Sequence, residues 1–425
     1  MKEIYVLYGK SKLTAKIPDK NLQAVLSTPK HPSGNETETI RSALCNPVES
    51  KRLKELSRNV KSICIISSDH TRPVPRRLTL PLILEELARP AEDYDITVLI
   101  ATGLHRPMTK EEIDERFGSE ITSKCAVINH CAENMDSLKY CGILQTSGRP
   151  LYLNRIASEC DLLIAEGFIE PHFFAGFSGG RKAVLPGIAG AETIMNNHSP
   201  QNIAHPKACM ASLDGNPIHE EALEAAGIAK LKFILNVTLN EEKQITGAFA
   251  GDMEKAHLAG CLFVKRNMTM PCRQTDIVIT SNNGYPLDRN VYQMVKGIDT
   301  ASSAVRDGGV IIIAGDCIDG IGSESFVRLL HGCSSARELF EKMSSGEADI
   351  DQWTVQILAR ILVRNTVILV TDKLTKEAVN GIFMEYAPTL TEALSMAFEK
   401  MGADATVNVI PEGPVVIPKV HSRQQ

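Results

Sequence analysis

The sequence Gly-Phe-Ile-Glu-Pro-His-Phe-Phe-Ala-Gly-Phe-Ser-Gly-Gly-Arg-Lys, residues 167–182, is the most informative part of the chain. It follows a short apolar run, Asp161 to Ile164, which is typical of a buried strand. In an open α/β sheet, ligands bind in the crevice beyond the carboxyl ends of the strands. Four of the twelve phenylalanines of the chain lie in this stretch, so we expect a loop with apolar walls that exclude water.

The second half of this stretch combines backbone freedom with positive charge. The tripeptide Ser178-Gly179-Gly180 lets the backbone approach a ligand closely and direct N–H groups at an anion. Arg181 and Lys182 follow it and add two cationic side chains. The reactive candidates in this stretch are His172 and Lys182.

Two other apolar strands run into polar loops in the same way. The run Ile63 to Ile66 leads into Ser67-Ser68-Asp69-His70-Thr71-Arg72-Pro73, and the run Asp95 to Ala101 leads into Thr102-Gly103-Leu104-His105-Arg106-Pro107. Residues 109–112, Thr-Lys-Glu-Glu, form a capping box, which places His105 between a strand and the start of a helix. Strands separated by helices predict βαβ units and a mainly parallel sheet. We therefore expect the three loops to share one edge of that sheet.

A second α/β series begins near residue 272. Strands are predicted at 276–280, 310–314 and 366–370, with helices near 336–343 and 355–363. The fold class is thus predicted to be α/β, with two domains whose mainly parallel sheets are flanked by helices. We expect an N-terminal domain of residues 1–270, a C-terminal domain of residues 271–425, and an active site in the cleft between them.

Shorter elements complete the prediction. Residues 4–8 and 13–17 read as an N-terminal hairpin, and residues 232–239 and 244–249 as a second hairpin. Residues 49–58 and 78–87 have apolar side chains at helical spacing.

Composition limits the class of ligand. The 425 residues are 43% hydrophobic with a net charge of -5, which gives no electrostatic footprint for nucleic acid or an anionic membrane. No apolar run is long enough to span a bilayer, and the start lacks the apolar core of a signal peptide, so a cytoplasmic protein is expected. Eleven cysteines without a C-x-x-C pair fit reduced, packed thiols. The expected ligand is a small molecule.

Taken singly, each candidate side chain has an ordinary explanation. A loop histidine is as often structural as functional, and Asp69 suits a turn or a helix cap. Arg72, Arg181 and Lys182 could be solvated charges, and Trp353, the only tryptophan, could be a packing residue. What favours function is that several of these residue types are expected to meet at one sheet edge.

Taken together, the motifs resemble the lactate racemases that carry a nickel-pincer nucleotide. The resemblance covers nearly the whole chain: it includes residues 67–75, 101–107 and 167–187, the tripeptide Asn197-His198-Ser199, and residues 284–288, 292–297 and 351–353. The long central motif is highly specific, and we see no departure from the family at the positions that matter.

The resemblance implies a role for each matching residue. Lys182 would carry the pyridinium mononucleotide through a thioamide, His198 would ligate Ni(II), and His105 with His172 would be the paired acid and base. Cofactor contacts are expected from Asp69, His70, Thr71, Ser178, Gly179 and Gly180. Substrate contacts are expected from Arg72, Tyr292, Gln293, Lys296 and Trp353. Whether residues 178–180 or residues 70–71 bind the nucleotide phosphate is left open by the sequence.

The implied reaction explains these residue types. The C2 hydrogen of a 2-hydroxy acid is too weakly acidic to be removed as a proton, whereas its transfer as hydride gives a planar ketoacid, pyruvate from lactate, that accepts hydride on either face. A cofactor must then supply the hydride acceptor. Two histidines could exchange the hydroxyl proton on the two faces. Arg72 and Lys296 could hold the carboxylate while C2 inverts.

Three alternatives remain at this point. A sibling racemase or epimerase for malate, phenyllactate or an aldonic acid would share the cofactor and the histidines, and would differ around the third carbon of the substrate. A zinc hydrolase built on His105, His172 and His198 lacks close ligand spacing such as H-E-x-x-H. A non-catalytic carrier of the nucleotide would not need both His105 and His172.

Maturation enzymes that deliver the cofactor are expected as transient partners, because the chain has no obvious biosynthetic domain.

Overall fold

The computed structural model describes residues 1–28, 34–240, 242–346 and 348–421. Its first sheet has six strands in the order β13-β12-β9-β4-β5-β6. All neighbouring strands are parallel except β13, which is antiparallel to β12 and completes the second predicted hairpin. The strands are β4 (Ser62–Ser68), β5 (Asp95–Ala101), β6 (Ala126–Asn129), β9 (Leu162–Phe168), β12 (Leu231–Leu239) and β13 (Ile245–Gly251).

Helices cover both faces of this sheet because successive side chains of a strand point to opposite sides. In β4, Ile63 and Ile65 join one apolar core, and Cys64 and Ile66 join another. The first core is completed by α1 (Glu36–Cys45), α3 (Arg76–Glu85) and α4 (Lys110–Lys124); the second is completed by α5 (Arg155–Glu159), α6 (Ala191–Asn197) and α8 (Pro217–Ile228).

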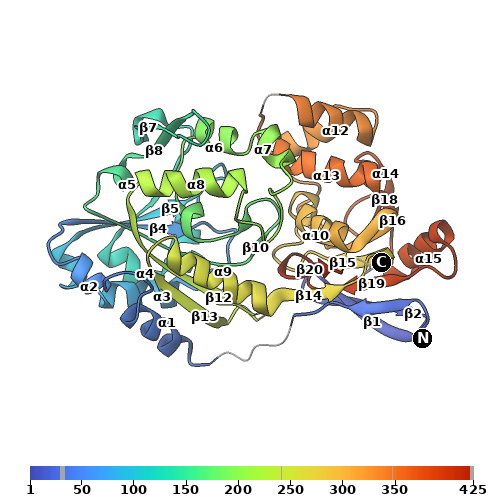
Figure 1. The fold of residues 1–425 in the computed structure, drawn as a ribbon, viewed down its shortest axis with the longest axis horizontal. Helices are drawn as coiled ribbons and strands as arrows, with labels where there is room; N and C mark the ends of the chain where they lie inside the picture. The colour runs from blue at the N-terminus through green and yellow to red at the C-terminus, as the bar shows by residue number, and fades with distance from the viewer. Residues whose placement is uncertain (29–33, 241, 347, 422–425) are drawn as a thin grey trace.

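The second sheet is parallel throughout and has the order β18-β17-β16-β15-β19-β3. Figure 1 shows it in the half of the molecule opposite the first sheet. The strands are β3 (Leu22–Val25), β15 (Thr275–Ser281), β16 (Val305–Ala314), β17 (Thr366–Val370), β18 (Glu385–Ala387) and β19 (Val407–Ile410). The helices packed on its faces are α10 (Val291–Ala304), α11 (Glu324–His331), α13 (Gln352–Arg364) and α15 (Leu390–Met401), with α12 (Ala336–Ser345) packed on α13.

The N-terminal segment packs with the second sheet. The predicted hairpin forms from β1 (Lys2–Tyr8) and β2 (Ser11–Ile17), and its buried face joins the core beneath β15, β16 and α15. The strand β3 then pairs with β19. The expected division into residues 1–270 and 271–425 assigns this segment to the other half. Short strands of this kind carry no sequence signal for which sheet they join.

The expected helix at residues 49–58 is much shorter than predicted. Only α2 (Leu53–Leu56) is helical there. Upstream, the backbone N–H of Val48 donates to the carbonyl of Ala250 at 2.8 Å, and Glu49 adopts a φ of 47°. This bridge to β13 draws the chain away from a helical path.

The two halves meet around the carboxyl ends of β4, β5 and β9. The helix α9 (Lys255–Met268) leads into β14 (Thr269–Cys272), which pairs with β20 (Ile417–Val420) between the two sheets (Figure 1). On the other side, Gln356 Nε2 donates to the carbonyl of Pro200 in α7 (Pro200–Ala204) at 3.0 Å. No helix in the described ranges is long and apolar enough to cross a membrane.

Candidate active site

A cavity of about 190 Å³ lies where the loops after β4, β5 and β9 face the second half of the chain. The sheet order makes these strands neighbours, so the prediction that their loops share one edge is confirmed. Residues 292–296 of α10 and 351–354 at the start of α13 close the cavity from the other half. The expected site residues that line it are Asp69, Arg72, His105, His172, Ser178, Gly179, Gly180, Lys182, His198, Tyr292, Gln293, Lys296 and Trp353.

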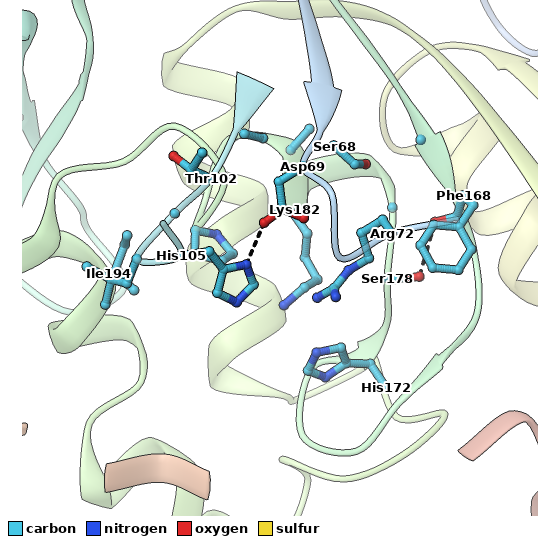
Figure 2. A pocket seen from close by; sticks show the side chains of 18 of the residues that line it. Ser68, Asp69, Arg72, Thr102, His105, Phe168, His172, Ser178, Lys182 and Ile194 are labelled. Carbon is cyan, nitrogen blue, oxygen red and sulfur yellow. Dashed lines mark hydrogen bonds and ion pairs between the residues drawn. The ribbon is translucent and has the colours of Figure 1, made fainter. Parts of the chain in front are cut away.

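His105 is held by a carboxylate in the loop after β4, the strand next to β5. Its Nδ1 lies 2.6 Å from Oδ2 of Asp69, whose side chain is only 2% exposed (Figure 2). Burial alone would raise the pKa of Asp69, but the hydrogen bond and charge of His105, together with the charge of Arg72, hold that pKa well below its usual range. Because the carboxylate is ionised, it accepts a hydrogen bond from the Nδ1–H group of His105. The neutral ring then has no proton on Nε2, which is left as an acceptor.

His172 has the opposite environment. Its Nδ1 faces the backbone N–H of Ala175 at 3.2 Å, so this nitrogen is an acceptor and the proton of the neutral ring lies on Nε2. Its ring stacks on Phe173 with centroids 5.0 Å apart and meets Phe174 edge-on. Burial, followed by the charges of Lys182 and Lys296, lowers the pKa of His172 well below its usual value. The two histidines therefore offer different atoms for proton exchange.

Three basic side chains, those of Arg72, Lys182 and Lys296, enter the cavity together. Figure 2 shows Lys182 and Arg72 reaching toward the same space above His172. Among the described residues, Lys182 Nζ has no hydrogen-bond partner, and it lies 5.5 Å from the centroid of the Phe174 ring. Burial, followed by the charges of Arg181, Arg72 and Lys296, lowers the pKa of Lys182 well below its usual value. Such a site favours an anionic ligand and keeps the lysine amine nucleophilic.

The helix α10 supplies the remaining polar groups. Gln293 and Lys296 lie three residues apart in α10, and Lys296 Nζ donates to Oε1 of Gln293 at 2.8 Å. Burial, followed by the charge of Arg72, lowers the pKa of Lys296 to about 8. Tyr292 packs edge-on against Phe326, and burial raises the pKa of its hydroxyl.

His198 follows α6 and is enclosed by aromatic rings. Its ring centroid lies 5.0 Å from that of Phe174 and 5.1 Å from that of Trp353. Its Nδ1 is buried without a hydrogen-bond partner, and burial lowers its pKa to about 3. A neutral imidazole with an unpaired nitrogen is suited to ligate a metal ion.

No group of three His, Cys, Asp or Glu side chains is arranged to hold a metal ion in the part of the chain that the structure describes. His105, His172 and His198 are thus not arranged as the ligands of one metal ion in these described ranges. A metal bound at His198 would need its other donors from a bound group. That arrangement fits a metal that arrives within a cofactor.

The expectation that Arg181 adds a cationic side chain to the ligand site is wrong. Arg181 is 1% exposed and donates to the carbonyl oxygens of Ala175 at 2.6 Å and Phe177 at 2.8 Å. His257 Nε2 lies 2.8 Å from the carbonyl of Ser178, so the glycine-rich loop is fixed from behind.

The polar groups of this loop are used within the protein. Ser178 Oγ accepts from the N–H of Glu170 at 2.9 Å, and Gly180 N–H donates to Oδ1 of Asn236 at 2.7 Å. Gly179 has a φ of 78°, and a Cβ there would lie 2.7 Å from that same oxygen, so a side chain has no room. The Ser178-Gly179-Gly180 segment thus shapes the cavity wall without presenting a row of free N–H groups.

Two expected cofactor residues lie outside the cavity lining. Thr71 donates through its backbone N–H to Oδ1 of Asp69 at 2.9 Å, and its hydroxyl accepts from Arg72 at 3.0 Å. His70 is half-buried with an unpaired Nδ1, and burial lowers its pKa. Thr71 thus supports the loop that carries Asp69 and Arg72.

A buried network beneath that loop was missed by the sequence analysis. Arg76 donates to the carbonyls of Ser68 and Asp69, both at 2.5 Å, and to Ser67 Oγ at 3.1 Å. Glu166 accepts from Ser67 at 2.5 Å and Thr79 at 2.9 Å, and its carboxylate lies 3.9 Å from Arg76. The available signal was an acidic residue inside the apolar strand β9, since a buried charge is normally paired.

The sequence matches the family model of the lactate racemase N-terminal domain over residues 8–211 and that of the lactate racemase C-terminal domain over residues 270–418. The chain belongs to the lactate racemase family. Lactate racemase of Thermoanaerobacterium thermosaccharolyticum is 45% identical over 423 residues, which are 98% of this chain and 99% of the relative. Lactate racemase of Lactiplantibacillus plantarum is 45% identical over 418 residues, 97% and 98% of the two chains.

A solved structure of this lactate racemase family has the same architecture. The structure of the lactate racemase apoprotein from Thermoanaerobacterium thermosaccharolyticum superposes with a TM-score of 0.95 at 46% identity, and the match covers 98% of this chain and all of that one. The predicted family and α/β fold class are confirmed. As a member of this family the chain is an isomerase of the racemase type.

Proposed function

We propose that this chain interconverts D- and L-lactate in the cavity between its two halves. The proposal is carried by one observation: two histidines with opposite proton arrangements and three basic side chains line a single cavity. The whole-length relationship to lactate racemases supports lactate as the substrate.

Arg72 and Lys296 are proposed to bind the substrate carboxylate. Both side chains line the cavity and come from opposite halves of the chain. The planar guanidinium of Arg72 suits two-point binding of a carboxylate, and Lys296 adds a point charge that Gln293 orients at 2.8 Å. With the carboxylate fixed, C2 can invert without release of the substrate.

His105 and His172 are proposed to exchange the hydroxyl proton. The unprotonated Nε2 of His105 takes the proton of a hydroxyl that faces it, and Asp69 stabilises the positive ring that results. The Nε2–H of His172 hydrogen-bonds an oxygen that faces the other side. Phe173 and Phe174 exclude water around His172, so protons pass between the substrate and the two rings.

A nickel-pincer nucleotide held by Lys182 and His198 is the proposed cofactor. The residues fit such a group, because Lys182 offers an unpaired amine and His198 an unpaired ring nitrogen, and no complete metal site exists among the described residues. When bound, the group would supply an acceptor for the C2 hydrogen with its electron pair. Its delivery by maturation enzymes and a cytoplasmic location belong to the same proposal.

Isotopic labelling tests this reaction. Lactate racemised in heavy water by cofactor-loaded enzyme is expected to keep its original C2 hydrogen, because an acceptor inside the cavity is shielded from water. C2-deuterated lactate is expected to react more slowly, and quenching should release a trace of pyruvate. Stoichiometric uptake of solvent deuterium at C2 would show that the C2 hydrogen leaves as a proton, and would refute hydride transfer. Loaded enzyme that leaves lactate unchanged would refute the proposed function itself.

A further inference from the structure

The helix α8 packs against both segments that carry the proposed attachment points of the cofactor. One segment is the short helix η3 (Gly180–Ala183), which contains Lys182. The other is α6, which ends directly before His198 (Figure 1). Side chains of α6, α8 and η3 share one apolar core. The distance between Lys182 and His198 therefore depends on how each segment sits on α8.

A buried hydrogen bond joins the last residue of α6 to α8. Nδ2 of Asn197 donates to Oε2 of Glu221 at 2.6 Å and to the carbonyl oxygen of Ile218 at 3.3 Å. Asn197 is fully buried, and Glu221 is 2% exposed. On the other side, the carbonyl oxygen of Asn197 accepts from Nδ2 of Asn202 in α7 at 3.0 Å. Residue 197, and with it the peptide bond to His198, is thus anchored on two helices.

Glu221 is a costly residue if it only supports the fold. Its carboxylate accepts from Asn197 through Oε2, whereas Oε1 is buried without a hydrogen-bond partner among the described residues. Burial of an incompletely paired charge costs free energy, and an apolar side chain of similar size is often no less stable in such a place. What an apolar side chain cannot supply is the directional, charge-assisted bond to Asn197.

The direction of the His198 ring depends on where the backbone places residue 198. A metal-ligating histidine usually takes its orientation from a hydrogen bond at its second ring nitrogen. Nδ1 of His198 has no such partner in the part of the chain that the structure describes. The preceding helix α6 has only seven residues and no side-chain cap at Gly190, so its own hydrogen bonds hold its last turn weakly. Tertiary contacts therefore have to fix this turn.

We propose that Glu221 is a positioning residue for the nickel ligand: through Asn197 it holds His198 at a fixed distance from Lys182, so that both can engage one bound cofactor. This inference rests on the proposed function. Neither Glu221 nor Asn197 lines the cavity, so both act through His198 and not on the substrate. Loss of the pair should weaken nickel binding and leave the attachment at Lys182 unchanged.

The test compares how fast cofactor-loaded variants lose nickel. Loaded protein is dialysed against EDTA, nickel is followed by metal analysis, and the visible absorption of the nickel centre is recorded. Glu221→Leu should lose nickel roughly tenfold faster than the unsubstituted protein and should shift the absorption. Glu221→Gln keeps the shape and one oxygen acceptor, and it should lose nickel more slowly than Glu221→Leu. The mass increase at Lys182 should persist in both variants.

A matched control separates positioning from general stability. Asn408 is as buried as Asn197 and donates to the carbonyl oxygen of Arg273 at 2.8 Å in the second half of the chain. Asn197→Ala and Asn408→Ala should both lower the midpoint of urea unfolding, but only Asn197→Ala should lose nickel faster. Because Glu221 acts through Asn197, the double variant Glu221→Leu/Asn197→Ala should lose nickel no faster than Asn197→Ala.

The outcomes distinguish this inference from the proposed function. Nickel loss and absorption in Glu221→Leu like those of the unsubstituted protein refute the positioning role, and racemisation of lactate then stands. Equal nickel loss in Asn197→Ala and Asn408→Ala also refutes it. If Glu221→Leu does not fold, Glu221→Gln and Asn197→Ala give the same decision. Loaded protein that retains nickel but leaves lactate unchanged refutes the proposed function, while the positioning of His198 is still decided by nickel loss.

Discussion

Asp69 fixes His105 through a contact of 2.6 Å between Oδ2 and Nδ1, and it does so from the loop after β4, the neighbour of β5 in the same parallel sheet. The carboxylate is buried, so its charge acts on the ring with little screening. This contact selects which ring nitrogen of His105 faces the cavity.

Replacement of Asp69 by asparagine should change which ring nitrogen of His105 carries the proton. An amide can donate to Nδ1, which would move the ring proton to Nε2 and remove the proton acceptor from the cavity. We expect kcat for lactate to fall on the order of 10²-fold or more, with a smaller change in KM. Steady-state kinetics of Asp69→Asn and of Asp136→Asn, an exposed aspartate, would show the difference. Equal kinetics of the two variants would mean that the contact does not control His105.

The roles proposed for Lys182 and for the three histidines predict that cofactor attachment, nickel content and racemisation are lost in different variants. His198→Ala should lower the nickel content of loaded protein, and Lys182→Ala should abolish a mass increase that maps to the Lys182 peptide. His105→Ala and His172→Ala should retain the metal and lose racemisation, because their rings are proposed to move protons. Metal analysis and intact-protein mass spectrometry measure nickel content and cofactor attachment, and a lactate racemisation assay measures the loss of activity. If all three histidine variants lose nickel alike, the assignment is wrong.

The lowered pKa of Lys296 predicts a fall in activity at high pH. Burial and Arg72 bring this pKa to about 8, so the ammonium loses its proton as the pH rises through 8. A neutral amine attracts the substrate carboxylate less than an ammonium does. The value of kcat/KM for lactate should therefore be highest below about pH 8 and decline above it. Lys296→Arg, whose charge persists, should move this decline to higher pH. An unchanged pH profile in that variant would assign the decline to another group.

The buried network under the Asp69 loop predicts a graded effect on stability. Glu166→Ala removes the acceptor of Ser67 and Thr79 and the charge beside Arg76, so it should destabilise the fold by about 3–5 kcal/mol. Glu166→Gln keeps acceptor capacity and shape, and it should cost less. Urea unfolding of both variants followed by circular dichroism measures the difference. Equal losses would show that the charge beside Arg76, which both variants remove, matters more than the shape and hydrogen bonds of this side chain.

Much of the site was predictable because chain topology imposes it. Once three apolar strands are recognised as parallel neighbours, Arg72, His105 and His172 must follow their carboxyl ends at one edge. The opposite wall, from α10 and α13, depended on the family resemblance, since no spacing rule links residues as distant in sequence as Arg72 and Trp353 to a shared cavity.

The direction of a side chain was the part that sequence could not supply. Arg181 and Lys182 are adjacent cations in the same loop, yet Arg181 turns inward to backbone carbonyls and Lys182 turns toward the cavity. Only the placement of His257 and the neighbouring carbonyls decides this. Likewise, the pairing of β3 with β19 depends on which edge is open after the rest of the second sheet has formed.

The pairing of β3 with β19 also sets an order of events during synthesis. The first sheet draws its strands from residues 62–251 and is complete long before β19 leaves the ribosome. At roughly 5–20 residues per second, the apolar face of the β1–β2 hairpin and the edge of β3 wait on the order of tens of seconds for their partners. The first residues translated are thus among the last to be buried, and their apolar side chains stay uncovered in the nascent chain throughout that interval.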